Sequence, residues 1–150
     1  MAQTLVYYRY HTVFSTKHRR PMITPEVMPE LIKVIGGIIA DRDGALLAMN
    51  GTPDHVHLLT FFSQKRAIAD VVRDIKAVSC DWIHGKFPGL AEFAWQSGYG
   101  SFTVSRSLTD RAERYIANQQ NRHRKETFEH EFITLLDRHG VEYDPKYVLD

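Results

Sequence analysis

The chain has 150 residues, of which 43% are hydrophobic and 25% charged, and its formal net charge is +1. This length and composition suit one globular domain over residues 1–150, with no linker-like or low-complexity stretch dividing it. The single cysteine, Cys80, excludes an internal disulfide and a cysteine-rich zinc site. We find no signal peptide and no apolar run long enough to span a bilayer, so we expect a cytoplasmic protein without membrane contact.

Basic residues are concentrated in two short runs, although the net charge is close to zero. The runs are Lys17-His18-Arg19-Arg20 and Arg122-His123-Arg124-Lys125. A run of like charges is usually a solvated face, so a phosphate-binding role for these runs is favoured only if both lie beside the histidines of the chain.

The first third of the chain predicts a strand followed by a helix. Alternating aromatic and β-branched residues indicate a strand over Val6–Ser15, with His11 and Val13 on the same face. Apolar residues at helical spacing then indicate a helix within Thr24–Arg42. Its start is open between Thr24-Pro25-Glu26, acting as a cap, and Pro29. Gly36-Gly37 lies in its middle, where we expect close packing against the sheet.

The middle of the chain predicts a hairpin, a second helix and a fourth strand. These are strands over Ala45–Asn50 and His55–Phe62, a helix over Ala67–His84 and a strand over Tyr99–Val104. The resulting order, βαββαβ, is that of the α+β ferredoxin-like (RRM-like) fold, an antiparallel sheet with two helices on one face. The other face would be open and is a common nucleic-acid platform, although a fold alone does not establish a function.

Two more helices are expected after the fourth strand. The first, about Asp110–Lys125, is mostly polar and places Tyr115, Gln119 and His123 on one face. The second, about Thr127–His139, is amphipathic, and Gly140 is placed to end it.

The stretch Asp54–Leu59 contains a candidate metal site. Side chains alternate along a strand, so His55 and His57 project from one face while Val56 and Leu58 project from the other. Two imidazoles can bind one divalent cation but do not complete a site. Paired strand histidines are also often simple surface or packing residues, and a metal site needs a third ligand from elsewhere.

Taken together, these motifs resemble the HUH-type single-tyrosine transposases of the insertion-sequence-200/605 class (IS200-like transposases). The resemblance covers essentially the whole chain, through Ser15-Thr16-Lys17, Pro53-Asp54-His55-Val56-His57-Leu58-Leu59, Trp95-Gln96-Ser97-Gly98-Tyr99-Gly100 and Tyr115-Ile116-Ala117-Asn118-Gln119. A histidine, an apolar residue and a histidine form a weak motif alone. Joined to a later Tyr-x-x-x-Gln in so short a chain, they form a specific one. The departures are Thr52, where many relatives carry an apolar residue, and a tail that lacks a tryptophan.

The resemblance implies a metal-dependent transposase that acts on single-stranded DNA, at the hairpin ends of a mobile element. Tyr115 corresponds to the nucleophile, and its attack would give a 5′-phosphotyrosine and a free 3′-OH before strand transfer. His55, His57 and Gln119 correspond to the ligands of a divalent metal, Mg²⁺ or Mn²⁺. The resemblance also implies a homodimer in which each tyrosine helix completes the partner's histidine site in trans.

Other residues are candidates for supporting roles. His11, Asp54 and His123 are possible contacts of the metal ligands or the nucleophile, and the sequence names no certain base for the tyrosine. The candidate DNA-phosphate contacts are Lys17, Arg19, Arg20, Arg122, Arg124 and Lys125. Two alternatives remain open: a non-catalytic module of ferredoxin-like fold that binds single-stranded nucleic acid, and a domesticated relative that acts on genomic repeats.

Overall fold

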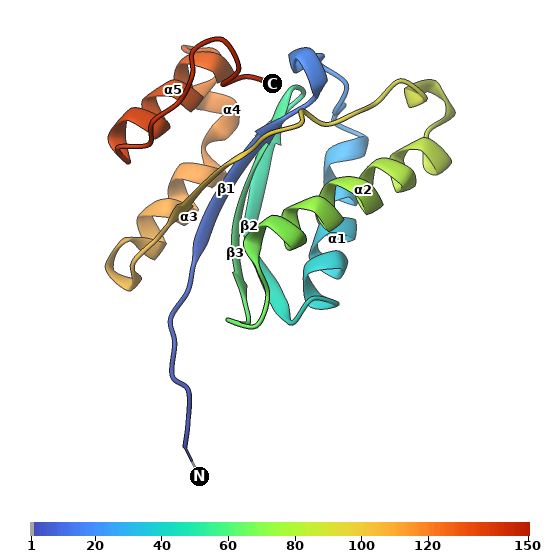
Figure 1. Ribbon diagram of the computed structural model, residues 1–150. Helices are drawn as coiled ribbons and strands as arrows, with labels where there is room; N and C mark the ends of the chain where they lie inside the picture. Colours follow the sequence, from blue (N-terminus) through green and yellow to red (C-terminus); the bar gives the residue numbers. More distant parts are fainter. Residues whose placement is uncertain (1) are drawn as a thin grey trace.

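The computed structural model describes residues 2–150 and contains one four-stranded antiparallel sheet. The strands lie in the order β2-β3-β1-β4, where β1 is Tyr10–Ser15, β2 is Gly44–Thr52, β3 is His55–Phe62 and β4 is Gly100–Thr103. Helices lie on both faces, as Figure 1 shows, and they are α1 (Val27–Ala40), α2 (Ile68–Lys86), α3 (Thr109–Ala117), α4 (Gln119–Arg122) and α5 (Phe128–Arg138). The predicted ferredoxin-like arrangement of the α+β class is confirmed.

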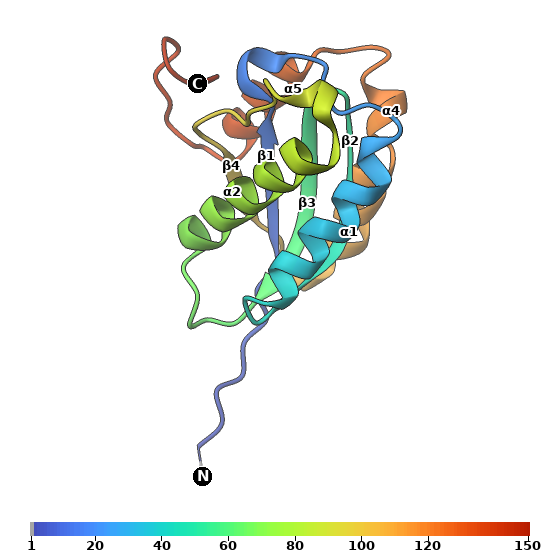
Figure 2. The same ribbon diagram turned by 90° about the vertical axis from the view of Figure 1, so that its right-hand side faces the viewer.

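Helices α1 and α2 cover one face of the sheet and enclose the larger core (Figure 2). Val56 and Leu58 of β3 point into this core, as the alternation of the strand predicts. Burying each such side chain contributes roughly 1.5–3 kcal/mol to stability. This core therefore holds β3, with its two histidines, at the centre of the molecule.

The opposite face is not open, contrary to our expectation. Helices α3 and α4 lie over β2 and β3, and α5 packs on a second apolar cluster that includes Val13, Phe102 and Phe132. The approach of α5 is close, since a Cβ atom on Gly100 would lie 2.8 Å from Phe132 Cε1. The C-terminal helices therefore form a third layer, and the residues of β3 that face them are buried.

The first strand begins at Tyr10 rather than at Val6. Tyr10 pairs with Thr60 of β3 and with Thr103 of β4, which is the last residue of that strand. Residues 6–9 lack ladder partners on both sides, and Val6 is exposed. Figure 1 shows this segment leaving the body of the protein. The β propensity of the segment is real, but β4 ends opposite Tyr10, so the segment has no strand beside it on that side.

Helix α1 begins at Val27, because the backbone N–H groups of Val27 and Met28 donate to the carbonyl of Thr24. This start favours the first of the two candidates, and Pro29 lies in the first turn, where a missing N–H is tolerated. The close packing expected at Gly36-Gly37 is wrong. A Cβ on Gly36 would lie 3.8 Å from Leu46, and one on Gly37 would meet nothing within 4 Å.

Helix α5 has the ends that its flanking residues predict. The side chain of Thr127 accepts a hydrogen bond from the backbone N–H of His130, and Gly140 adopts a φ of 64° just after the helix. Within residues 2–150, no helix combines the length and the apolar character that crossing a membrane requires.

Candidate active site

The two histidines of β3 face the C-terminal helices. In the antiparallel ladder His55 lies opposite Ser15 and His57 opposite Val13, so both side chains project to the face that α3, α4 and α5 cover. Both are fully buried. The pair therefore lies between the sheet and the third layer, and not on the surface.

A carboxylate orients His55. Its Nδ1 lies 2.7 Å from Asp54 Oδ1, and the hydroxyl of Thr52 donates to the same carboxylate oxygen at 2.8 Å. A carboxylate can only accept, so Nδ1 donates and Nε2 faces the interior of the site. Burial alone would lower the pKa of His55, but hydrogen bonds with Asp54, Glu131 and Gln119 outweigh it and raise this pKa to about 9. Thr52, a departure from the family pattern, thus supports the Asp54–His55 pair.

A third histidine supports His57. His11 of β1 is buried, and its Nε2 lies 2.8 Å from His57 Nδ1. Burial and the neighbouring His57 lower the pKa of His11 to about 3, and burial lowers the pKa of His57 to about 4. Both rings are therefore neutral near pH 7, which is the form of imidazole that binds metals.

The polar C-terminal helix is interrupted, contrary to the single helix expected over Asp110–Lys125. Helix α3 ends at Ala117, Asn118 has a φ of −96° and a ψ of 15°, and α4 begins at Gln119. Asn50 of β2 donates to the carbonyl of Ala117 at 3.1 Å, and its amide also pairs with that of Gln120. The contacts of Asn50 hold the interruption against β2, so Gln119 belongs to a different helix from Tyr115.

The interruption still brings the three predicted side chains of this segment together. Gln119 is fully buried, with its Oε1 at 3.0 Å from His55 Nε2. The ring of Tyr115 lies 5.7 Å from those of His11 and His57, and the ring of His123 lies 4.4 Å from that of His55. Tyr115, Gln119 and His123 therefore converge on the histidine pair within one chain.

At the centre of these groups lies a residue that the sequence analysis missed. Glu131 of α5 is 1% exposed, and its Oε1 accepts from His57 Nε2 at 3.0 Å and from His123 Nε2 at 2.7 Å. Its Oε2 accepts from the Tyr115 hydroxyl and, at 3.0 Å, from the Gln119 amide. One signal was available, since Glu131 shares the apolar face of α5 with Phe128, Phe132 and Leu135. A carboxylate on such a face needs buried partners.

Charge at the centre keeps Tyr115 protonated. Burial and then the hydrogen bond to the Glu131 carboxylate raise the pKa of Tyr115 well above its ordinary value. Burial would raise the pKa of Glu131, but the hydrogen bonds from His123, His55 and His57 outweigh it and hold this pKa far below the usual range. In this arrangement Glu131 is an anion and Tyr115 is a hydrogen-bond donor.

The donor set fits a metal ion. His55, His57, His123 and Glu131 each offer one ligand atom, and these four atoms lie within 4.8 Å of one another. Imidazole nitrogens and a carboxylate oxygen suit Mn²⁺, Co²⁺ and Zn²⁺. The group could therefore hold a divalent cation.

The first basic run is largely engaged in internal contacts. Arg19 Nε lies 2.9 Å from Glu129 Oε1, and its Nη1 donates to the carbonyl of Leu149 at 3.1 Å. Arg20 lies 3.4 Å from Glu92. The contacts of Arg19 join the loop to α5 and to the end of the chain, and among residues 2–150 Lys17 and His18 make no side-chain contact of this kind.

The second basic run lies beside the site. Arg122 lies over the ring of Tyr115, at 4.8 Å from its centroid, and pairs with Glu126. Arg124 and Lys125 line a surface groove together with Asn118. Among the described residues only the second run has a side chain in contact with the candidate site, so the condition that both runs lie beside the histidines is not met.

A narrow groove also reaches Tyr115 from the side of α5 and β4. It has a volume of about 190 Å³ and is lined by His11, Tyr115, Arg111 and Arg138, among others. Within residues 2–150 neither arginine makes an ion pair. Arg111 and Arg138 are therefore two further candidate phosphate contacts, which the sequence analysis did not single out.

A ferredoxin-like sheet that presents a histidine pair to a tyrosine on a C-terminal helix defines a class of DNA-processing enzymes, and comparison with known proteins identifies the family. The model of the family described as "Transposase IS200 like" matches residues 4–119, so the chain belongs to the IS200-like transposase family. The match includes His55, His57, Tyr115 and Gln119, whereas His123 and Glu131 lie beyond it.

Individual relatives agree with this assignment. The chain is 29% identical over 118 residues to the ISDra2 transposase TnpA of Deinococcus radiodurans, covering 75% of this chain and 84% of the relative. A crystal structure from Deinococcus radiodurans R1, assigned as a transposase, has 29% identity and a TM-score of 0.64 and covers 79% of this chain and 96% of its own.

A further solved structure shows the same fold at lower identity. It is that of a REP-associated tyrosine transposase bound to a REP hairpin, with 19% identity and a TM-score of 0.60, covering 82% of this chain and 74% of the other.

Proposed function

We propose that this transposase cleaves single-stranded DNA by attack of Tyr115 on a phosphodiester, with a divalent metal held beside it. The observation that carries the proposal is the convergence of Tyr115 and Gln119 on His55 and His57 within one chain. A binding module without catalysis would have no need of a buried tyrosine and glutamine joined to a histidine pair by hydrogen bonds, so no observation favours that alternative.

The proposed step is a transesterification. The Tyr115 oxygen forms a bond to phosphorus, the bond from phosphorus to the 3′ oxygen breaks, and the products are a 5′-phosphotyrosine and a 3′-OH. A tyrosine ester nearly conserves the phosphodiester energy, so the strand can be joined to another 3′-OH without ATP. A bound Mg²⁺ or Mn²⁺ would supply charge neutralisation and orientation at the phosphate.

The residues of the chain have separate tasks in this reaction. Helix α3 holds Tyr115 against the histidines, and a phosphate in the groove lined by Arg111 and Arg138 would lie beside the Tyr115 side chain. Asp54 and His11 fix the ring orientation of His55 and His57. The phenol must lose its proton during attack. Before the reaction this proton is donated to the Glu131 carboxylate in a hydrogen bond.

Single-stranded DNA with hairpin ends is the proposed partner. Family membership supports it, and the solved relative bound to a REP hairpin shares the fold. Arg122, Arg124 and Lys125 lie on the same side of the molecule as Tyr115, where a strand leaving the site would pass. Phosphate contacts of this kind make binding weaken as salt increases.

The test is formation of a covalent adduct. The full chain is mixed with labelled single-stranded oligonucleotides that carry the flanking ends of its own gene, in the presence of Mn²⁺. We expect an adduct that peptide mapping assigns to Tyr115, no adduct with Tyr115→Phe, and an unchanged adduct with the matched control Tyr99→Phe. An adduct that persists in Tyr115→Phe would show that another residue is the nucleophile, and no adduct with any end sequence would favour a binding module.

A further inference from the structure

We infer that a metal ion in this protein is bound by His55, His57, His123 and Glu131, with Gln119 as a positioning residue rather than a ligand. The family resemblance implies a different set, the histidine pair with Gln119. His123 and Glu131 lie outside residues 4–119, which match the family model. The inference rests on the proposed function only in taking this cluster to be a metal site.

Three ring nitrogens from different parts of the chain converge on one oxygen. Glu131 Oε1 lies 2.7 Å from His123 Nε2, 3.0 Å from His57 Nε2 and 3.4 Å from His55 Nε2. The rings come from β3 and from the segment after α4, and the carboxylate comes from α5. The strand β3, the residue after α4 and the helix α5 therefore position these four side chains together around one oxygen atom.

The other ring nitrogens explain why each Nε2 is available. His55 Nδ1 donates to the Asp54 carboxylate, and His123 Nδ1 lies 2.9 Å from the backbone carbonyl of Glu126, which can only accept. His57 Nδ1 faces His11 Nε2 and can donate to it. Metal binding would require each ring to keep its proton on Nδ1 and carry a lone pair on Nε2, in place of the Nε2–H that faces Glu131 in the metal-free arrangement.

Three imidazole lone pairs and a carboxylate oxygen cannot share a centre without positive charge between them. In the metal-free arrangement protons supply that charge, together with Arg122, whose Nε lies 3.3 Å from Glu131 Oε2, and a divalent cation can supply it with little movement. A tetrahedral ion with bonds near 2.1 Å places neighbouring ligand atoms roughly 3.4 Å apart. The distances from Glu131 Oε1 to the three nitrogens, 2.7–3.4 Å, are close to that value.

Gln119 contacts two members of this set, since its Oε1 lies 3.0 Å from His55 Nε2 and its amide nitrogen is bound to Glu131, and we assign it to positioning because of the second contact. Its Nε2 donates to Glu131 Oε2 at 3.0 Å, the oxygen that also accepts from Tyr115, so it turns Oε1 toward the three rings. The resulting ligand set has three imidazoles and one negative charge, whereas the set with Gln119 is neutral. Such a set favours Mn²⁺, Co²⁺ or Zn²⁺ over Mg²⁺, which prefers oxygen ligands and octahedral geometry.

Metal binding without DNA tests the inference. Co²⁺ and Mn²⁺ are titrated separately into the metal-free full chain by calorimetry, and the visible spectrum of the Co²⁺ form is recorded. We expect Glu131→Gln to lose about 100-fold or more in affinity and to change the Co²⁺ spectrum, and Gln119→Ala to lose about tenfold and keep it. Glu129→Gln is the matched control on α5, since Glu129 pairs with Arg19 outside the site, and it should bind as the wild type does.

Undiminished affinity and an unchanged spectrum in Glu131→Gln would overturn the inference. A second measurement uses the wild type alone, in case that variant fails to fold. Pulsed electron paramagnetic resonance of the Mn²⁺-loaded protein should detect three coordinated imidazole nitrogens, and two would contradict the four-residue set. If either metal-binding measurement contradicts the four-residue set, the adduct assay still tests the proposed function. If metal binds as expected but no adduct forms, only the proposed function is contradicted.

Discussion

The hydroxyl of Tyr115 donates a hydrogen bond to Glu131, and this contact joins α3 to α5 at the centre of the candidate site. The same carboxylate receives the Gln119 amide and three histidine rings. A single side chain of α5 therefore organises both the proposed nucleophile and the residues that could bind a metal.

The close approach of α5 to β4 depends on Gly100. Gly100→Ala should lower the free energy of unfolding by about 1–3 kcal/mol, because the new methyl group would overlap Phe132. Gly37→Ala, a glycine in α1 with free space around it, is the matched control and should stabilise by up to about 1 kcal/mol. Urea denaturation measures both, and equal effects would mean that α5 does not approach β4 closely.

The Asp54–His55 hydrogen bond should support metal binding. Asp54→Asn keeps the shape but removes the charge that holds His55 Nδ1, so Mn²⁺ affinity should fall by about 10–100-fold in a calorimetric titration. Asp43→Asn removes a carboxylate whose ion-pair partner among residues 2–150 is Arg66, and it should leave affinity unchanged. A loss of equal size in both variants would point to a general effect of net charge.

The metal-free protein should be most stable near pH 6.5. Folded His11 and His57 bind protons only near pH 3 and pH 4, so below about 6.5 the unfolded chain takes up more protons and stability falls as pH decreases. Folded His55 holds its proton to about pH 9, so its contribution is lost as pH rises from about 6.5 through 9.

Thermal melts in a chelator, taken across this pH range, measure both effects. His11→Gln should weaken the acid limb of the profile and leave the alkaline limb in place. An acid limb of unchanged slope in His11→Gln would show that His11 is protonated in the folded state.

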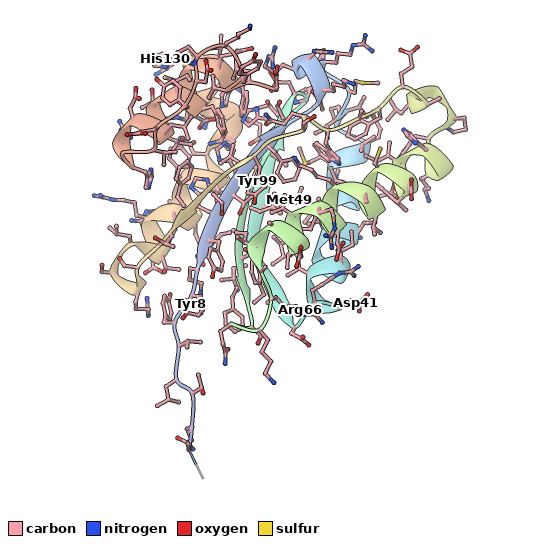
Figure 3. The ribbon with its side chains drawn as sticks, viewed as in Figure 1. Tyr8, Asp41, Met49, Arg66, Tyr99 and His130 are labelled. Carbon is pink, nitrogen blue, oxygen red and sulfur yellow. The ribbon has the colours of Figure 1, made fainter. Side chains whose placement is uncertain are left out.

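Arg124 and Lys125 should contact DNA phosphates. Replacing both with alanine should weaken binding of a single-stranded oligonucleotide and reduce the slope of log affinity against log salt by about 1.4, or about 0.7 for each phosphate lost. Lys65→Ala with Arg66→Ala removes the same charge at the other end of the molecule, where Figure 3 shows Arg66 far from His130 of α5. If both double variants lose the same slope, the DNA path does not follow α4.

A homodimer with sites completed in trans stays a prediction of the family resemblance. In the chain as described, Tyr115 already meets its own His57. If the tyrosine helices exchange between subunits, mixing Tyr115→Phe with His57→Ala should restore adduct formation, because one of the two sites in each heterodimer is intact. If the heterodimers react no better than either parent variant, the tyrosine and the histidines of one active site come from the same chain.

Strand alternation and helix-capping patterns correctly predicted those features of the site that depend on a single strand or helix. The alternation of β3 placed His55 and His57 on one face, and Thr127 and Gly140 marked the ends of α5. The i, i+4 and i+8 spacing brought Tyr115 into the same cluster as Gln119 and His123 even though the helix is interrupted.

Features that depend on contacts between distant elements escaped prediction. The start of β1 coincides with the end of β4, and the interruption at Asn118 is held by Asn50 of another strand. Glu131 could be recognised as an odd residue on an apolar face, but its partners come from β3, α3, α4 and the turn that follows α4. No spacing rule links those positions.

The position of α5 in the chain has a consequence for biosynthesis. The residues of the sheet and both histidines are synthesised before Glu131, and chains generally fold as their N-terminal parts emerge. Until α5 docks, the face that carries the histidines lacks both its apolar cover and its central carboxylate. A chain whose α5 has not yet docked therefore lacks Glu131 beside the histidines, so we expect the proposed site to be complete only once this C-terminal helix is in place.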